Sequence, residues 1–123
     1  MNIIKANILN ITRGIICHQV NCMGKMGAGL ALDIRHKWPI VYESYMYAYR
    51  EGLLQLGVVG CVAVIENQLY VANLCGQKYY GRGKQYTDYT AVRQCLTQIA
   101  KYERKELPIY IPKGMGCNLA GGD

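Results

Sequence analysis

The apolar positions along this chain follow two spacings, one typical of strands and one typical of helices. Residues 15–20 form a mostly apolar run, which predicts a strand buried on both faces of a sheet. Farther on, Leu30, Ile34 and Trp38 recur at the spacing of one helix face. Pro39 predicts the end of that helix, because proline disfavours helical geometry in the residue before it.

The rest of the chain continues this pattern. Polar residues 66–68 separate two β-rich runs and so predict a hairpin. Thr87 or Asp88 is expected to cap a later helix that carries Ala91 and Cys95 on one face. The other expected elements are a first strand over residues 2–9, a helix over residues 42–51, hairpin strands over residues 58–65 and 69–74, and a strand over residues 107–111.

Strands that alternate with helices predict an α/β fold with a mixed central sheet. The chain has 123 residues, enough to bury one apolar core, and neither a linker nor a repeat interrupts it. We therefore expect a single domain over residues 1–123.

Two glycine-rich segments, residues 21–31 and 112–123, each follow a strand. Ligands of α/β sheets bind beyond the carboxyl ends of the strands, so both segments are expected at that end. Backbone N–H groups of such a turn, together with the start of a helix, attract phosphate. One glycine turn can also have purely steric reasons, but two at one sheet edge predict a phosphate-bearing ligand.

Charge and cysteine content narrow the class of protein. The formal net charge of +6 favours anionic ligands, and the basic segment 78–84 makes nucleic-acid binding a less favoured alternative. The six cysteines lack the spacing of a zinc site, so we expect neither a metal nor another cofactor. With free cysteines, no secretory signal and no membrane-spanning stretch, the sequence predicts a cytoplasmic protein.

The two glycine segments also carry a resemblance to a known family. Residues 20–31 read Val-Asn-Cys-Met-Gly-Lys-Met-Gly-Ala-Gly-Leu-Ala, and residues 116–123 read Gly-Cys-Asn-Leu-Ala-Gly-Gly-Asp. In this order they resemble the two ligand loops of macrodomains, which bind ADP-ribose. The resemblance is greatest to the branch that holds ADP-ribose 1''-phosphate phosphatases and terminal ADP-ribose hydrolases, and it implies a three-layer α/β/α fold.

The resemblance also implies which residues of the first loop bind the ligand. Asn21 would hydrogen-bond the distal ribose, and the backbone N–H groups of Gly27, Ala28 and Gly29 would hold the diphosphate. Gln77, a polar residue at a strand end, is a further candidate for the pocket.

The remaining candidate ligand residues lie near the two ends of the chain. Asn7 and Ile8 stand where the family carries an aspartate that accepts from the adenine amino group. The amide of Asn7 can still accept that hydrogen bond, without charge assistance. The candidates in the second loop are Gly114, Gly116, Cys117, Asn118 and Leu119.

Hydrolysis of a 1''-phosphate needs a base that activates water, and His18 and Asp123 are the candidate catalytic residues. For His18 the alternative is a core histidine with a satisfied ring, and for Asp123 it is a helix cap. The related hydrolase that removes ADP-ribose from glutamate uses a lysine after the central strand. Here that place reads Leu-Cys-Gly over residues 74–76, which favours the phosphatase.

The sequence thus predicts a macrodomain that converts ADP-ribose 1''-phosphate into ADP-ribose and phosphate. A non-catalytic reader or sponge of ADP-ribose-type nucleotides and a de-ADP-ribosylating hydrolase remain alternatives. The family normally continues past the second loop with a helix and a strand, whereas this sequence stops at Asp123. Two explanations remain possible: the chain is truncated, or a partner chain covers the gap.

Overall fold

A computed structural model describes residues 2–3, 7–79, 87–101 and 107–112 of the chain. These residues form a five-stranded mixed sheet with the strand order β1-β5-β2-β4-β3. The elements are β1 (Asn2–Ile3), a 3₁₀ turn η1 (Ile8–Asn10), β2 (Gly14–Asn21), α1 (Gly29–Lys37), α2 (Pro39–Arg50), β3 (Val59–Ile65), β4 (Leu69–Gln77), α3 (Tyr89–Ala100) and β5 (Ile109–Ile111).

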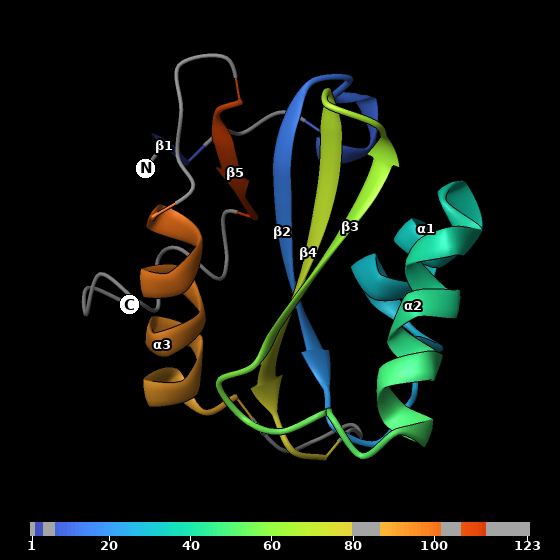
Figure 1. The fold of residues 1–123 in the computed structure, drawn as a ribbon, viewed down its shortest axis with the longest axis vertical. Coiled ribbons are helices and arrows are strands. Elements are labelled where there is room, and N and C mark those ends of the chain that lie inside the picture. Colours follow the sequence, from blue (N-terminus) through green and yellow to red (C-terminus); the bar gives the residue numbers. More distant parts are fainter. Residues whose placement is uncertain (1, 4–6, 80–86, 102–106, 113–123) are drawn as a thin grey trace.

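The elements are arranged in three layers. The α1 and α2 helices cover one face of the sheet and α3 covers the other (Figure 1). The β2 strand runs parallel to both β4 and β5, and β3 is antiparallel to β4. The expected α/β/α architecture with a mixed sheet is therefore confirmed.

The β2 strand lies in the middle of the core and is buried on both sides. Ile16 and Val20 pack in the apolar layer below α1 and α2, together with Ile34. Ile15 and Cys17 pack in the second layer, against α3. This two-sided burial explains why the strand reads as a nearly continuous apolar run in the sequence.

Most of the expected elements are present, with small shifts at their ends. The hairpin of β3 and β4 is confirmed, and its turn uses Asn67 at a positive φ of 62°. Asp88 caps α3, where its Oδ1 accepts the N–H of Ala91 at 2.9 Å. The α2 helix begins earlier than expected, at Pro39, because a proline at the first helical position needs no N–H.

The expected first strand over residues 2–9 is confirmed at Asn2–Ile3 and wrong at residues 7–9, whereas residues 4–6 lie outside the described part of the chain. Asn7 instead caps η1, and its Oδ1 accepts the N–H of Leu9 at 2.9 Å. Ile8 is buried in the layer below α1 and α2. The mixture of β-branched and polar residues in this stretch is compatible with a strand, but asparagine also makes such local turns, and here the turn forms.

Candidate functional site

The turn between β2 and α1 lies at the carboxyl end of the parallel strands (Figure 1). Gly27, Ala28 and Gly29 are exposed there. The first N–H that bonds within α1 is that of Leu32, to the carbonyl of Ala28 at 3.3 Å. The N–H groups before it have no acceptor inside the helix, and no acidic side chain lies in the first turn of α1. This turn can therefore attract an anion through its backbone.

The side chain of Asn21 is used to shape this turn. Its Oδ1 accepts the N–H of Met23 at 2.9 Å and that of Lys25 at 3.3 Å. Its Nδ2 donates to the carbonyl of Lys25 at 2.8 Å, and the residue is only 7% exposed. The predicted hydrogen bond from Asn21 to a ribose stays a prediction. It would have to use the hydrogen-bonding capacity of the amide that these contacts within the turn leave free.

The side chain of Tyr45 reaches the same turn from α2, a contact that no pattern in the sequence predicts. Its hydroxyl oxygen lies 2.5 Å from the backbone carbonyl oxygen of Asn21 and accepts the N–H of Lys25 at 3.2 Å. Tyrosines are frequent in α2, so only the contact itself distinguishes this one.

Gln77 belongs to a small polar cluster beside the turn. The end of β4 pairs with the end of β2, so that Gln77 stands next to Asn21. Gln19 donates through Nε2 to Gln77 Oε1 at 2.5 Å and to Thr87 Oγ1 at 2.9 Å. Gln77 Nε2 in turn donates to the carbonyl of Tyr79 at 2.7 Å. Gln19 was missed, although a polar residue at the end of an apolar strand is a usable signal.

The structure places His18 in the interior and not at the exposed turn. The side chain is 1% exposed, and Nε2 lies 2.5 Å from Asn73 Oδ1, to which it donates. Burial lowers the pKa of the imidazole to about 4, against the effect of the Asn73 hydrogen bond. His18 is therefore a core histidine, but only half of its ring is satisfied, because Nδ1 has no partner among the described residues. A base that touches a ligand at the turn does not fit this burial.

Asn7 and Ile8, the expected adenine residues, lie outside the glycine turn, but η1 contacts α1, which follows the turn, and Ile8 packs in the same layer as Met26. The adenine contact stays a prediction. Three residues separate η1 from the start of β2. η1 therefore lies at the end of the sheet where β2 begins (Figure 1). The glycine turn lies at the other end of the same strand. The second-loop candidates Gly114, Gly116, Cys117, Asn118 and Leu119 and the candidate base Asp123 fall outside the described residues.

The cysteines of the described part are free, and most are buried. Burial raises the pKa of the Cys17 thiol to about 12 and that of Cys95 to about 11, so both are protonated thiols at neutral pH. Over the described ranges, no group of three or more His, Cys, Asp or Glu residues could hold a metal ion. In the same part of the chain, no helix is long and apolar enough to cross a membrane.

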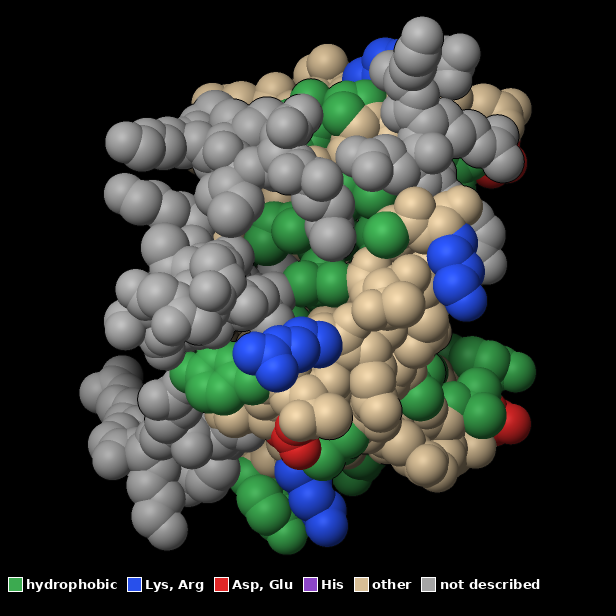
Figure 2. Space-filling model, turned by 90° about the vertical axis from the view of Figure 1, so that its left-hand side faces the viewer, with side chains coloured by type: hydrophobic (Ala, Val, Ile, Leu, Met, Phe, Trp, Pro, Cys, Tyr) green, Lys and Arg blue, Asp and Glu red, His purple; other side chains and the backbone are tan. Residues whose placement is uncertain are grey.

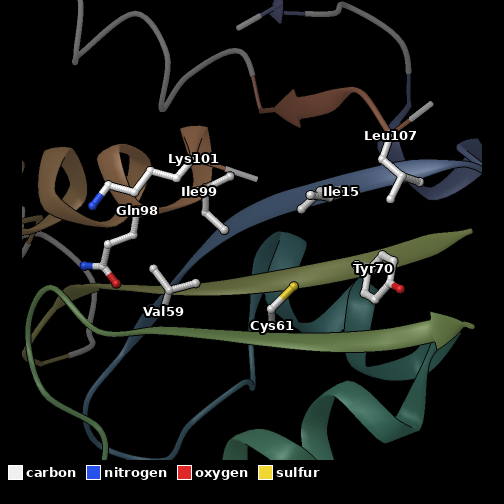
Figure 3. Close-up of a pocket in the computed structure, with 8 residues that line it drawn as sticks. All are labelled: Ile15, Val59, Cys61, Tyr70, Gln98, Ile99, Lys101 and Leu107. Carbon is white, nitrogen blue, oxygen red and sulfur yellow. The ribbon is translucent and has the colours of Figure 1, made fainter. Parts of the chain in front are cut away.

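A cavity of about 460 Å³ lies away from the turn, between α3 and the sheet (Figure 3). Figure 2 shows the α3 side of the molecule, where apolar side chains are visible in a hollow. The residues that line the cavity are mostly apolar: Ile15, Val59, Cys61, Tyr70, Gln98, Ile99, Lys101 and Leu107. It contains none of the candidate site residues.

Comparison with solved structures relates this arrangement to known proteins. A macrodomain protein from Streptomyces coelicolor is similar at a TM-score of 0.69 and 25% identity, over 84% of this chain and 69% of that one. Thermosipho africanus DarTG, solved in complex with ADP-ribose, matches at a TM-score of 0.75 and 20% identity, over 97% of this chain and 34% of its own. This chain has the macrodomain fold.

A nearer relative of this macrodomain is a protein of unknown function from Bacteroides thetaiotaomicron. It is 35% identical over 98% of this chain and 81% of its own length, with a TM-score of 0.77. The chain therefore belongs to the same family as that protein. No protein-family model and no curated protein matches the sequence.

Proposed function

We propose that this macrodomain binds ADP-ribose or a close derivative, with the diphosphate against the turn from Gly27 to Gly29. The observation that supports this proposal is that the turn is exposed, holds no acidic residue and presents N–H groups at the start of α1 that have no acceptor within the helix. Those groups complement a diphosphate. The complex of DarTG with ADP-ribose shares this fold and supports the choice of ligand.

The test adds one negative charge to the turn. Ala28 is the exposed N-cap of α1 with an extended backbone (φ −153°, ψ 158°), which suits Asp and Asn equally. Isothermal titration with ADP-ribose should show binding to the wild type, and Ala28→Asp should bind at least about tenfold more weakly than Ala28→Asn because a carboxylate repels the diphosphate. Equal affinities of the two variants would argue against diphosphate at this turn, and no binding to the wild type would refute the function.

We further propose that the reaction is hydrolysis of ADP-ribose 1''-phosphate. Water attacks the phosphorus, the bond from phosphorus to the oxygen on C1'' breaks, and phosphate and ADP-ribose leave. Support comes from the resemblance of residues 116–123 to the loop of the phosphatase branch, and Asp123 is the proposed base. His18 is left out, because its ring is buried.

Release of inorganic phosphate from ADP-ribose 1''-phosphate measures this reaction. Asp123→Asn should lower the turnover number by about a hundredfold or more, the usual contribution of a general base, while ADP-ribose still binds. Phosphate release at the wild-type rate would remove Asp123 from the mechanism. Binding without turnover of this substrate would instead identify a reader, and release of ADP-ribose from a modified peptide would identify a de-ADP-ribosylating hydrolase.

A further inference from the structure

The hydroxyl of Tyr45 lies at the base of the glycine turn. Tyr45 belongs to α2 and is 2% exposed. Its oxygen lies 2.5 Å from the backbone carbonyl oxygen of Asn21 and 2.8 Å from Asn21 Oδ1, and it accepts the N–H of Lys25 at 3.2 Å. A hydroxyl has one hydrogen, so it donates to one of the Asn21 oxygens at a time while it accepts from Lys25.

We propose that Tyr45 is a positioning residue of the ligand site, whose hydroxyl ties the end of β2 to the middle of the turn and so fixes the exposed amides that follow. We call this set of contacts, from the Tyr45 hydroxyl to Asn21 and Lys25, the Tyr45 brace. Its role in binding rests on the proposed function, whereas its effect on the turn does not.

Other contacts hold the turn against the same helix. Gly24 has a φ of +76°, and a Cβ built on it would lie 2.9 Å from the ring of Tyr49. Tyr45 and Tyr49 are four residues apart, so they stand on one face of α2. Met26 is 1% exposed and packs in the core below that helix. Gly24 and Met26 thus anchor the turn against α2, and residues 27–29, which follow, are exposed.

Packing alone does not account for the hydroxyl. A phenylalanine ring would fill the same space, but the Asn21 carbonyl and the Lys25 N–H would each lose a buried partner. Burial raises the pKa of Tyr45 well above its ordinary value, so the hydroxyl stays a neutral donor and acceptor at physiological pH. A turn held in its binding shape costs less to order when a ligand arrives, which increases affinity.

The variant Tyr45→Phe removes the brace and keeps the ring. We expect it to bind ADP-ribose about five- to tenfold more weakly, the fold-change that corresponds to a lost hydrogen bond. Tyr47→Phe is the matched control, because Tyr47 lies on the same helix and is 60% exposed. It should bind like the wild type. Unchanged affinity of Tyr45→Phe, in a wild type that binds, would overturn the inference.

Amide hydrogen exchange tests the brace without any ligand. In the wild type the Lys25 amide should exchange more slowly than the exposed Gly27 amide, and in Tyr45→Phe it should exchange about tenfold faster. The Ile99 amide in α3 should not change, which separates the brace from a loss of overall stability. A Lys25 amide that exchanges as fast as that of Gly27 in the wild type would refute the brace, whatever the protein binds and even where the variant does not fold.

Discussion

The imidazole of His18 shows how one residue couples the core to pH. It lies in the layer that also holds Ile16 and Val20, and its Nδ1 has no hydrogen-bond partner in the described part of the chain. A charged ring would lose its hydration there with little compensation. Burial accordingly lowers its pKa from 6.5 to about 4.

This lowered pKa predicts acid sensitivity. Because the unfolded chain takes up the proton near pH 6.5 and the folded chain only near pH 4, stability is full above pH 6.5 and falls as the pH drops from 6.5 toward 4. The loss that His18 contributes is on the order of 3 kcal/mol. Urea unfolding at pH 7 and pH 4 should show a smaller difference for His18→Gln than for the wild type.

His36 provides the control for this experiment, since it is exposed on α1. His36→Gln should keep the wild-type pH dependence. If His18→Gln and the wild type lost the same free energy of unfolding between the two pH values, the buried neutral ring would not be the cause.

Among the elements, α3 has the clearest local signal. Asp88 precedes the helix and accepts the N–H of Ala91, one of the amides that a helix start leaves unpaired. The helix then buries Val92, Cys95 and Ile99 against the sheet. Capping and periodicity agree here, and for that reason the helix was predictable.

The cap of α3 gives a stability prediction. Asp88→Ala should lower the free energy of unfolding by about 1 kcal/mol, because the Ala91 N–H loses its acceptor. Asp88→Asn keeps a side-chain oxygen at that position and should cost far less. Thermal unfolding of the three proteins decides this, and an equal loss in both variants would show that the charge of Asp88 matters and not its capping oxygen.

The β2 strand and η1 show the limits of local patterns. The apolar run of β2 predicts one structure, a strand buried on both faces, because few other positions in a protein tolerate so many consecutive apolar residues. Residues 7–10 carry a mixed pattern that suits both a strand and a turn, and the side chain of Asn7 decides for the turn by bonding the N–H of Leu9.

At the scale of the whole molecule, the sheet order brings the candidate site together. The register of β2 against β4 sets Asn21 beside Gln77, and the position of α2 brings Tyr45 to the turn. The same topology places η1 on the face of the sheet that α1 and α2 cover, beside the start of β2, whereas the turn follows the end of that strand (Figure 1). A site of this kind depends on contacts between residues that are distant in the chain.

The sequence by itself determined the helices, most strands and the exposed glycine turn, because periodicity, capping and glycine are local properties. Only the tertiary structure decided which polar side chains face that turn. It buried His18 against Asn73, used Asn21 within the turn and added Gln19 to the cluster around Gln77. The physical reason is that a hydrogen-bond partner across a sheet or from a neighbouring helix is fixed by packing, which no spacing along the chain records.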